Sequence, residues 1–261
     1  MQKQREFMEK VILEAGALIR QRISEDMSIE EKENNRSDLV TSVDLEVERF
    51  LVDKISKEYP NDSFLTEENT VDLNEKDNVW VIDPIDGTMN FIYHLRDFAI
   101  SVALYVKGEG RLGFVYDVMA DELIIGEKGK GVTLNNEVVP PITPEILEQS
   151  IFDISLKSIR SLKRNEIADF YDITADVLTH RNIGSAALRT AHIGLNRNHI
   201  YISARLSFWD IAAAIIILEE LGGYHNFINR EVKFNSESFR FMAANNLEVY
   251  NEVIEKYFLN R

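Results

Sequence analysis

An apolar run ends abruptly in two carboxylates within residues 79–91, which read VWVIDPIDGTMNF. The run is typical of a buried β-strand, and Asp83 stands where it ends. Pro84 has a fixed φ and no N–H to donate, so we expect it to close the strand and begin a turn. The sequence therefore predicts a turn that directs Asp83, Asp86 and the Ile85 carbonyl toward one point.

Three hard oxygen donors would meet at this turn. With no Cys or His beside them, they suit Mg²⁺, with Mn²⁺ as the alternative, rather than Zn²⁺. Gly87 favours the tight geometry because glycine adopts backbone conformations closed to other residues. The simpler alternative is a solvated Asp-Pro-x-Asp-Gly turn that only caps the following helix. The rest of the chain decides between the two.

The composition is that of an acidic globular protein. The chain has 261 residues, 45% of them hydrophobic and 28% charged, which suits one large domain or two closely packed lobes. A formal net charge of −15 disfavours binding to nucleic acid or to an anionic membrane surface. Because there is no cysteine, neither a disulfide framework nor a thiolate metal site can form.

Targeting signals and membrane segments are not apparent. Residues 2–6 read QKQRE and lack the apolar run of a secretory signal. The longest apolar run, residues 211–218, is too short to cross a bilayer and stops at Glu219. We therefore expect a cytoplasmic protein without a membrane partner.

The first lobe, residues 1–140, combines helical and extended patterns and predicts an α+β arrangement. Apolar residues at helical spacing predict an amphipathic helix over residues 3–24. Thr41 or Ser42 suits the N-cap of a second helix, which carries Asp44 in its first turn. The extended segments are residues 63–66, 79–82, 99–107, 111–116 and 122–126.

The second lobe, residues 141–261, alternates strands with helices and predicts an α/β arrangement. Its extended segments include residues 151–155 and 200–202, and its helical segments are residues 186–195 and 211–221. Trp209 and Asp210 introduce the last of these helices, and Gly222-Gly223 ends it as a C-cap would. We expect the two lobes to form one integrated catalytic unit.

Four separated segments resemble the inositol monophosphatase family of metal-dependent, lithium-sensitive phosphatases. They are residues 38–44 (DLVTSVD), the Glu67-Glu68 pair that follows the strand at 63–66, residues 80–91, and residues 209–213 (WDIAA) ahead of Gly222-Gly223. Their order and spacing match over nearly the whole chain. The resemblance implies an α+β fold built as a layered αβαβα sandwich, usually assembled as a homodimer.

The resemblance also implies a site for two Mg²⁺ ions. Glu67, Asp83 and the Ile85 carbonyl would hold one ion. Asp83, Asp86 and Asp210 would hold the second, and a third, weaker ion would lie near Glu67. Paired ions bridge a phosphate, stabilise the attacking and leaving oxygens, and lower the pKa of a bound water. The implied activity is hydrolysis of a small-molecule phosphate monoester.

Further residues take roles around the phosphate by the same resemblance. Thr88 and Asp44, with Glu67, would orient and deprotonate the attacking water. The backbone N–H groups of Gly87 and Thr88 would hold the phosphate at a helix N-terminus. The other implied substrate-binding residues are Gly184, Ser185 and Ala186 on the leaving-group side, together with Ser203, Arg205 and Asp210.

Charge supports a metal site independently of the resemblance. Five carboxylates in one pocket would repel a phosphate dianion unless divalent cations lay between them. Taken singly, each group has a simpler explanation. Asp44 with Thr41, or Asp210, would serve only as a helix cap, and Glu67 would be a solvated strand end. Four matching segments in the expected order favour the metal site.

Two positions depart from the pattern of inositol-specific members. Their ring-binding glutamate lies seven residues before the aspartate of the Trp-Asp pair; that position is Ser203 here, with Arg205 nearby. The lysine common upstream of residues 38–44 is replaced by Glu33, beside Lys32. Because a guanidinium favours anionic groups, inositol monophosphate is one candidate substrate among sugar and nucleotide phosphates. The alternatives are fructose 1,6-bisphosphate, NADP and 3′-phosphoadenosine 5′-phosphate.

A non-enzymatic alternative is a regulatory binding protein that keeps the fold. A pure scaffold has no reason to retain the full set of chemical groups. That set comprises Glu67, Asp83, Asp86, Thr88 and Asp210. The sequence therefore favours an enzyme acting on a small-molecule phosphate.

Overall fold

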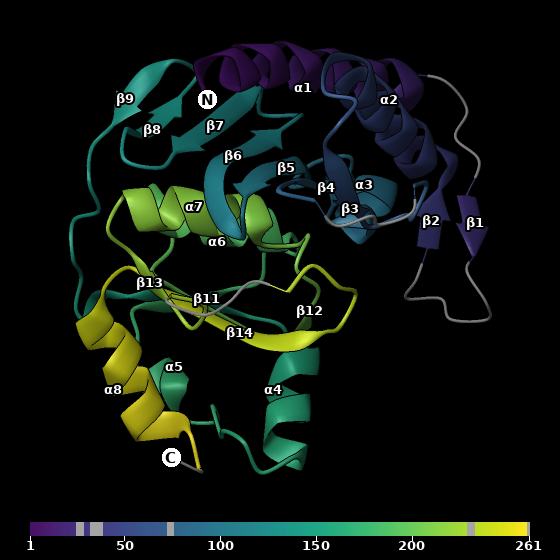
Figure 1. The fold of residues 1–261 in the computed structure, drawn as a ribbon. Coiled ribbons are helices and arrows are strands. Elements are labelled where there is room, and N and C mark those ends of the chain that lie inside the picture. The colour runs from purple at the N-terminus through teal and green to yellow at the C-terminus, as the bar shows by residue number, and fades with distance from the viewer. Residues whose placement is uncertain (25–28, 32–38, 72–75, 229–232, 260–261) are drawn as a thin grey trace.

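Layers of helix and sheet stack on one another in the computed structural model (Figure 1). The structure describes residues 1–24, 42–71, 76–228 and 233–259 in full, and the backbone of residues 29–31 and 39–41. A helix pair, a seven-stranded sheet, a second helix pair, a five-stranded sheet and a set of outer helices follow one another. The layered αβαβα arrangement of an α+β fold is thus confirmed.

The first helix pair consists of α1 Gln2–Ile23 and α2 Ser42–Glu58 and covers one face of the larger sheet (Figure 1). Both helices bury one apolar stripe because their apolar residues recur every three or four positions. Asp44 lies in the first turn of α2, as predicted. In the sequence, the short strands β1 Ile29–Glu31 and β2 Leu39–Thr41 lie between the two helices, and they pair with each other antiparallel.

The seven-stranded sheet has the order β3-β4-β5-β6-β7-β8-β9. Its first two strands are parallel and all later neighbours are antiparallel. The strands are β3 Ser63–Thr66, β4 Asn78–Asp86, β5 Ala99–Val106, β6 Glu109–Asp117, β7 Glu122–Glu127, β8 Gly131–Leu134 and β9 Glu137–Val139. Helix α3, Thr88–His94, follows β4 directly.

Strand β4 does not end at Pro84, and the sequence-based expectation on this point was wrong. The strand continues to Asp86, but its register against β5 shifts between Asp83 and Asp86. Such a bulge accommodates proline, because the extra residue makes no regular ladder hydrogen bond. Side chains three positions apart point to opposite faces of a regular strand. The bulge is therefore what allows Asp83 and Asp86 to point to the same side.

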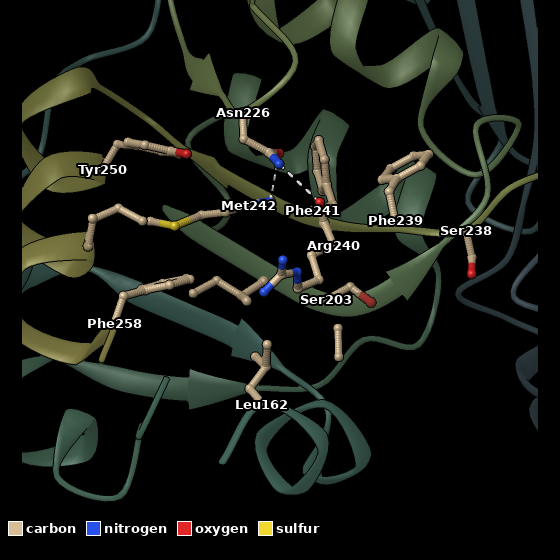
Figure 2. Close-up of a pocket in the computed structure, with 13 residues that line it drawn as sticks. Leu162, Ser203, Asn226, Ser238, Phe239, Arg240, Phe241, Met242, Tyr250 and Phe258 are labelled. Atoms are coloured by element: carbon tan, nitrogen blue, oxygen red, sulfur yellow. Dashed lines mark hydrogen bonds between the residues drawn. The ribbon is translucent and has the colours of Figure 1, made fainter. Parts of the chain in front are cut away.

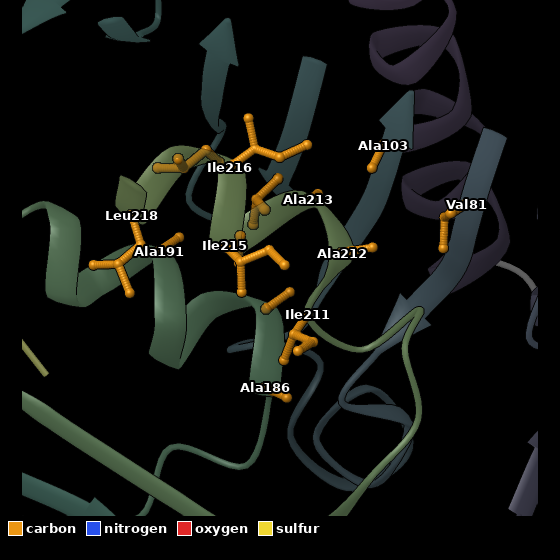
Figure 3. Close-up of a cluster of buried hydrophobic side chains, with 14 of the residues drawn as sticks. Val81, Ala103, Ala186, Ala191, Ile211, Ala212, Ala213, Ile215, Ile216 and Leu218 are labelled. Carbon is orange, nitrogen blue, oxygen red and sulfur yellow. The ribbon is translucent and has the colours of Figure 1, made fainter. Parts of the chain in front are cut away.

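The second helix pair, α6 Ala186–Gly194 and α7 Ala212–Glu220, lies between the two sheets (Figure 1). Helix α7 is apolar on nearly every side, and its side chains from Ala212 to Leu218 are buried. Figure 3 shows these side chains packed with Ala186 and Ala191 of α6 and near Ala103 of β5. The apolar composition of α7 follows from its place between two sheets.

Glycines have two roles around α7: one allows the helix to pack closely on the larger sheet, and two others form its C-cap. A Cβ atom on Gly113 of β6 would lie 2.3 Å from the carbonyl oxygen of Ala213. Gly222 has a φ of +91°, and the N–H of Gly223 donates to the Leu218 carbonyl at 3.0 Å. These are the features of a Schellman C-cap, so the predicted helix end at Gly222-Gly223 is confirmed.

The five-stranded sheet has the order β11-β10-β12-β14-β13. Strand β10 is parallel to β11 and β12, whereas β14 is antiparallel to β12 and β13. The strands are β10 Ile151–Ile154, β11 Thr179–Arg181, β12 Ile200–Leu206, β13 Tyr224–His225 and β14 Phe239–Ala244. The outer elements are the 3₁₀ turn Leu147–Gln149 and helices α4 Leu156–Arg164, α5 Ile173–Asp176 and α8 Leu247–Tyr257. In the described part of the chain, no helix has both the length and the hydrophobicity needed to cross a membrane.

Candidate active site

A cleft of about 810 Å³ lies where the carboxyl ends of parallel strands from both sheets come together. Segments after β3 and β4 line it from the larger sheet, and β12 with segments after β10 and β11 lines it from the smaller one. Such strand ends are the usual ligand sites of sheets with parallel strands. The predicted residues that line the cleft are Glu67, Asp83, Ile85, Asp86, Gly87, Thr88, Gly184, Ala186, Ser203 and Asp210.

The turn after Asp83 is fixed by its own hydrogen bonds. The buried Asp83 carboxylate accepts a hydrogen bond from the Ile85 N–H at 3.1 Å. The Thr88 hydroxyl donates to the Ile85 carbonyl at 3.3 Å, so this carbonyl faces the cleft side of the turn. Gly87 has a φ of +97°, and a Cβ there would lie 3.1 Å from the Ser185 Cβ. The predicted need for glycine at position 87 is therefore confirmed.

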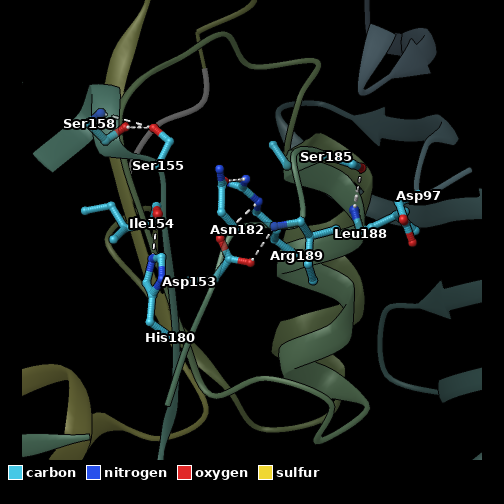
Figure 4. Close-up of polar contacts among 12 residues, drawn as sticks. Asp97, Asp153, Ile154, Ser155, Ser158, His180, Asn182, Ser185, Leu188 and Arg189 are labelled. Carbon is cyan, nitrogen blue, oxygen red and sulfur yellow. Dashed lines mark hydrogen bonds and ion pairs between the residues drawn. The ribbon is translucent and has the colours of Figure 1, made fainter. Parts of the chain in front are cut away.

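Asp86 joins the larger sheet to the start of helix α6. Its carboxylate accepts hydrogen bonds from the N–H groups of Ala186 at 3.1 Å and Ala187 at 2.7 Å, and from the Ser185 hydroxyl. Ser185 also caps the helix, because its hydroxyl accepts from the Leu188 N–H at 3.2 Å (Figure 4). The carboxylate is thus held by donors at a helix N-terminus, which favours its charged form.

Asp210 approaches the same point from the opposite side, just before α7. Its carboxylate accepts from the Ser207 N–H at 2.7 Å. One carboxylate oxygen from each of Asp83, Asp86 and Asp210 lies within 4.8 Å of the other two. Two segments far apart in the sequence, the end of β4 and the residues before α7, therefore bring three carboxylates to one point.

Burial raises the pKa of each of these three carboxyl groups. Burial, followed by the negative charge of Asp86, raises the pKa of Asp210 to about 7. Burial also raises the pKa of Asp83 well above its usual range, and the charges of Glu67, Asp86 and Asp210 add to this. For Asp86 burial again dominates, opposed by its hydrogen bonds from Ser185, Ala187 and Ala186. A cluster of this kind is stable in its charged form only with cations present.

Glu67 extends the cluster toward α2. Burial and the charge of Asp210 raise the pKa of Glu67 well above its usual range, and its carboxyl group shares a hydrogen bond with Asp83. Asp44 does not line the cleft; it is buried on α2, where its charge also acts on Glu67. Asp83 thus shares a hydrogen bond with Glu67 and also has a carboxylate oxygen within 4.8 Å of one from each of Asp86 and Asp210.

The donor set fits Mg²⁺ or Mn²⁺. Every side chain of the cluster offers oxygen, and the Ile85 carbonyl adds another oxygen beside it. Hard divalent cations prefer such ligands, whereas Zn²⁺ prefers nitrogen and sulfur. Burial first, and then the charges of the neighbouring carboxylates, raise the pKa values of Glu67, Asp83 and Asp210, and divalent cations would neutralise those charges.

The other wall of the cleft contains residues that the sequence analysis missed. Arg189 of α6 is buried, pairs with Asp153 at 3.2 Å and donates to the Asn182 side chain (Figure 4). Its guanidinium carbon lies 5.0 Å from the centre of the Tyr201 ring. A lone arginine within the small apolar residues of α6 was the available signal. Lys157, at the start of α4, also lines this wall.

Arg205 is not brought into the cleft. Its side chain is exposed, and its Nε donates to the Ser238 hydroxyl at 3.2 Å. The register of β12 against β14 shifts between Ser203 and Leu206, so Arg205 does not share the cleft-facing side of Ser203. The expectations on Lys32 and Glu33 lie outside the described residues.

A second hollow, of about 650 Å³, lies on the outer face of the smaller sheet between α4 and α8 (Figure 2). Most of its lining is apolar, and Arg240 is the charged residue within it. No carboxylate from the described residues lines this hollow. It is therefore not the candidate metal centre.

Comparison with known proteins identifies the family of this chain. The model of the inositol monophosphatase family matches residues 1–258. Inositol-1-monophosphatase of Bacillus subtilis (strain 168) is 36% identical over 254 residues, which cover 97% of this chain and 95% of that protein. A fructose-1,6-bisphosphatase/inositol-1-monophosphatase of Thermotoga maritima is 34% identical over 239 residues, covering 87% and 88%. The crystal structure of inositol monophosphatase II from Staphylococcus aureus MSSA476 has a TM-score of 0.83 and 32% identity, covering 100% of this chain and 96% of that one. The chain belongs to the inositol monophosphatase family.

Proposed function

We propose that this chain hydrolyses small-molecule phosphate monoesters with Mg²⁺ held at the carboxylate cluster. The observation that carries the proposal is the meeting of Asp83, Asp86 and Asp210, with oxygen atoms within 4.8 Å of one another, beside Glu67. Monoester hydrolysis requires accelerations of up to about 10²¹-fold, whereas side-chain acids and bases supply only about 10²–10⁴-fold. Metal ions are therefore central to the proposed reaction.

We propose that Asp83 is a ligand shared by two metal ions. Glu67, Asp83 and the Ile85 carbonyl would hold one Mg²⁺. Asp83, Asp86 and Asp210 would hold a second. A third, weaker ion would lie near Glu67, and Mn²⁺ is the alternative cation. When bound, such ions stabilise the attacking and leaving oxygens of the phosphate and lower the pKa of water.

The protein groups around the cluster position water and substrate. The Thr88 hydroxyl, already directed at the Ile85 carbonyl, would orient the attacking water together with Glu67. Asp44, which does not line the cleft, would help Glu67 to accept a proton, because the charge of Asp44 raises the pKa of Glu67. The backbone of Gly87 and Thr88 would contact the phosphate. The segment formed by Gly184, Ser185 and Ala186 would face the leaving group, with Asp210 and Ser203 nearby.

The candidate substrates are inositol monophosphate and related sugar or nucleotide phosphates. Fructose 1,6-bisphosphate is supported by the similarity to the fructose-1,6-bisphosphatase/inositol-1-monophosphatase of Thermotoga maritima. NADP and 3′-phosphoadenosine 5′-phosphate remain alternatives of the same reaction class. We further propose that the lobes of residues 1–140 and 141–261 act as one catalytic unit, in a cytoplasmic homodimer. Sedimentation of the purified chain tests the dimer.

Phosphate release across this substrate panel tests the proposed function. Wild-type protein should release phosphate with Mg²⁺, lose the activity in EDTA, and be inhibited by Li⁺. Asp86→Asn should lose at least about a hundredfold in kcat/KM, because the amide removes one charged metal ligand. Full activity of Asp86→Asn would refute the ligand assignment. Failure of the wild type on every substrate would favour a non-enzymatic role.

A further inference from the structure

The two walls of the catalytic cleft differ in charge. Acidic residues after β3 and at the end of β4 line the wall formed by the larger sheet. The opposite wall, at the carboxyl ends of β10 and β11, contributes Ser155, Lys157, Asn182 and Arg189. A substrate phosphate bound at the carboxylate wall would thus face neutral and cationic groups across the cleft.

The Arg189 side chain binds other residues of the cleft wall. Its guanidinium pairs with the buried Asp153 at 3.2 Å, donates to Asn182 and lies over the Tyr201 ring. Asp153 in turn accepts from the Ile183 N–H at 3.1 Å. The charge of Arg189 is therefore compensated within the wall, and its donors support the segment that leads to Gly184.

Lys157 differs from Arg189 in having no such partner. It is exposed in the first turn of α4 and lines the cleft, and no carboxylate of the described residues lies within 4.0 Å of its Nζ. Lys163 of the same helix, by contrast, pairs with Asp169 at 3.0 Å. In a chain with 44 acidic and 29 basic residues, a cation that faces the cleft without an acidic neighbour is available to a ligand.

The residues that share the cleft wall with Lys157 are neutral or are already paired. Ser203, which is neutral, stands where the inositol-specific pattern has a glutamate. The Ser155 hydroxyl caps α4 by accepting from the Ser158 N–H at 3.1 Å (Figure 4). Arg205, which the sequence suggested for anion binding, lies outside the cleft. Lys157 is thus the cleft cation free to bind a second anionic group.

We propose that Lys157 is a specificity-determining residue that binds a second phosphate group on the substrate. The preferred substrates are then small sugar or nucleotide bisphosphates whose scissile phosphate lies at the carboxylate cluster. This inference rests on the proposed phosphatase function. The Lys157 ammonium makes a charge-assisted contact, and because it is solvent-exposed the contact weakens with salt.

A matched substrate pair tests the assignment. Fructose 1-phosphate and fructose 1,6-bisphosphate share the same scissile group and differ only in the second phosphate. Wild-type kcat/KM should be at least about tenfold higher for the bisphosphate, mainly through a lower KM. Raising the NaCl concentration about sixfold, from roughly 50 to roughly 300 mM, should reduce this preference because salt screens the exposed Lys157 charge.

Two variants distinguish a specific role of Lys157 from a general effect of positive charge on α4. Lys157→Met should raise the KM for the bisphosphate by about tenfold and change kcat/KM for fructose 1-phosphate by less than about twofold. Lys163→Met, the control on the same helix, should leave both values unchanged because Lys163 pairs with Asp169 outside the cleft. Ser203→Glu should also reduce the bisphosphate preference, because it places a negative charge on the same wall.

Equal wild-type kcat/KM for the two fructose phosphates would overturn the inference, as would a preference that survives Lys157→Met. Loss of activity toward both substrates in Lys157→Met would assign the residue a structural role instead. If the wild type hydrolyses neither fructose phosphate, the other compounds of the substrate panel decide separately on the proposed function. Calorimetric binding of the same two compounds with Mg²⁺ then decides on Lys157, since only bisphosphate binding should weaken in Lys157→Met.

Discussion

The carboxylate of Glu48, buried on α2, accepts a hydrogen bond from the backbone N–H of Glu68 at 2.8 Å. Its other oxygen accepts from the N–H of Thr70 at 2.9 Å and from the Thr70 hydroxyl at 2.8 Å. Glu48 therefore holds the loop after β3 that presents Glu67 to the cleft. It supports the proposed metal site without lining the cleft itself.

Glu48→Gln should weaken Mg²⁺ binding. The amide nitrogen of glutamine would face an N–H donor, so at least one of the three hydrogen bonds is lost and Glu67 is less firmly held. We expect the Mg²⁺ concentration for half-maximal activity to rise about tenfold, with a loss of stability of about 1–3 kcal/mol. Activity as a function of Mg²⁺ and calorimetric titration of the ion measure both effects.

Glu46→Gln is the matched control for this experiment. Glu46 lies on the same helix and pairs with Arg22 of α1 at 2.7 Å, away from the cleft. Its replacement should alter stability by less than about 1 kcal/mol and leave the Mg²⁺ dependence unchanged. Equal Mg²⁺ dependence in both variants would show that Glu48 does not position the loop.

Ser185→Ala should affect stability and metal binding together. Its hydroxyl caps α6 and also donates to Asp86. Losing a helix cap costs about 1 kcal/mol, and losing the donor raises the pKa of Asp86, which disfavours its charged, metal-binding form. Thermal unfolding and Mg²⁺ titration of the variant measure the two effects separately.

Asn246→Ala is the control for a helix cap lost outside the cleft, together with the hydrogen bond that the Asn246 amide donates to the Glu145 carbonyl at 2.8 Å. The Asn246 side chain caps α8 by accepting from the Val249 N–H at 2.8 Å, and it does not line the cleft. This variant should lose similar stability without a change in Mg²⁺ affinity. A comparable shift in Mg²⁺ affinity for both variants would argue against a role for the Ser185–Asp86 contact.

The pKa of Asp210 predicts a pH-dependent stability of the metal-free protein. A carboxyl group with a pKa higher in the folded than in the unfolded chain stabilises the fold at low pH, and this contribution is lost as the pH rises through the folded value. For Asp210 the pKa rises from 3.8 to about 7. The window of loss is therefore about pH 4–7, with an upper limit of about 4 kcal/mol.

Asp210→Asn should remove this part of the pH dependence. In EDTA, the melting temperature of the wild type should fall relative to that of Asp210→Asn as the pH rises from 4 to 8. Saturating Mg²⁺ should reverse the order at pH 8, because the ions stabilise only the wild-type charge cluster. Parallel melting curves for the two proteins in EDTA would contradict the assignment.

Most of the fold and the carboxylate cluster could be predicted from local sequence. Asp83 and Glu67 each follow an apolar strand, and Asp210 precedes an apolar helix, so secondary structure places them at element ends. Strands β13 and β14 and helix α8 were missed, although Asn246 was an available N-cap signal for α8. Glu48 also had a signal, because it lies one turn after Asp44 on the buried stripe of α2.

Two β-bulges account for the errors at Pro84 and Arg205. The shift in β4 keeps the strand going past Pro84 and brings Asp86 to the side of Asp83. The shift in β12 has the opposite effect on Arg205, which strand alternation alone would place on the face of Ser203. A bulge depends on pairing with a distant strand, so spacing along one segment does not reveal it.

Gly113→Ala should destabilise the whole protein. Its new methyl group would lie 2.3 Å from the Ala213 carbonyl oxygen, so α7 has to move away from β6. Overpacking of this kind costs about 1–3 kcal/mol or more. Because Asp210 lies just before α7, the variant should also lose activity at temperatures where it remains folded. Urea unfolding combined with activity measurements tests this, and wild-type stability would refute the close packing.

The central claim is that Asp83 joins the two halves of a metal site used for phosphate hydrolysis. Phosphate release by wild type and Asp83→Asn, measured against Mg²⁺ concentration on folded protein, tests it most directly. We predict that the wild type is active only with Mg²⁺, and that Asp83→Asn loses about a thousandfold or more in kcat/KM at every Mg²⁺ concentration. Wild-type activity that persists in EDTA, or an Asp83→Asn variant as active as the wild type, would contradict it.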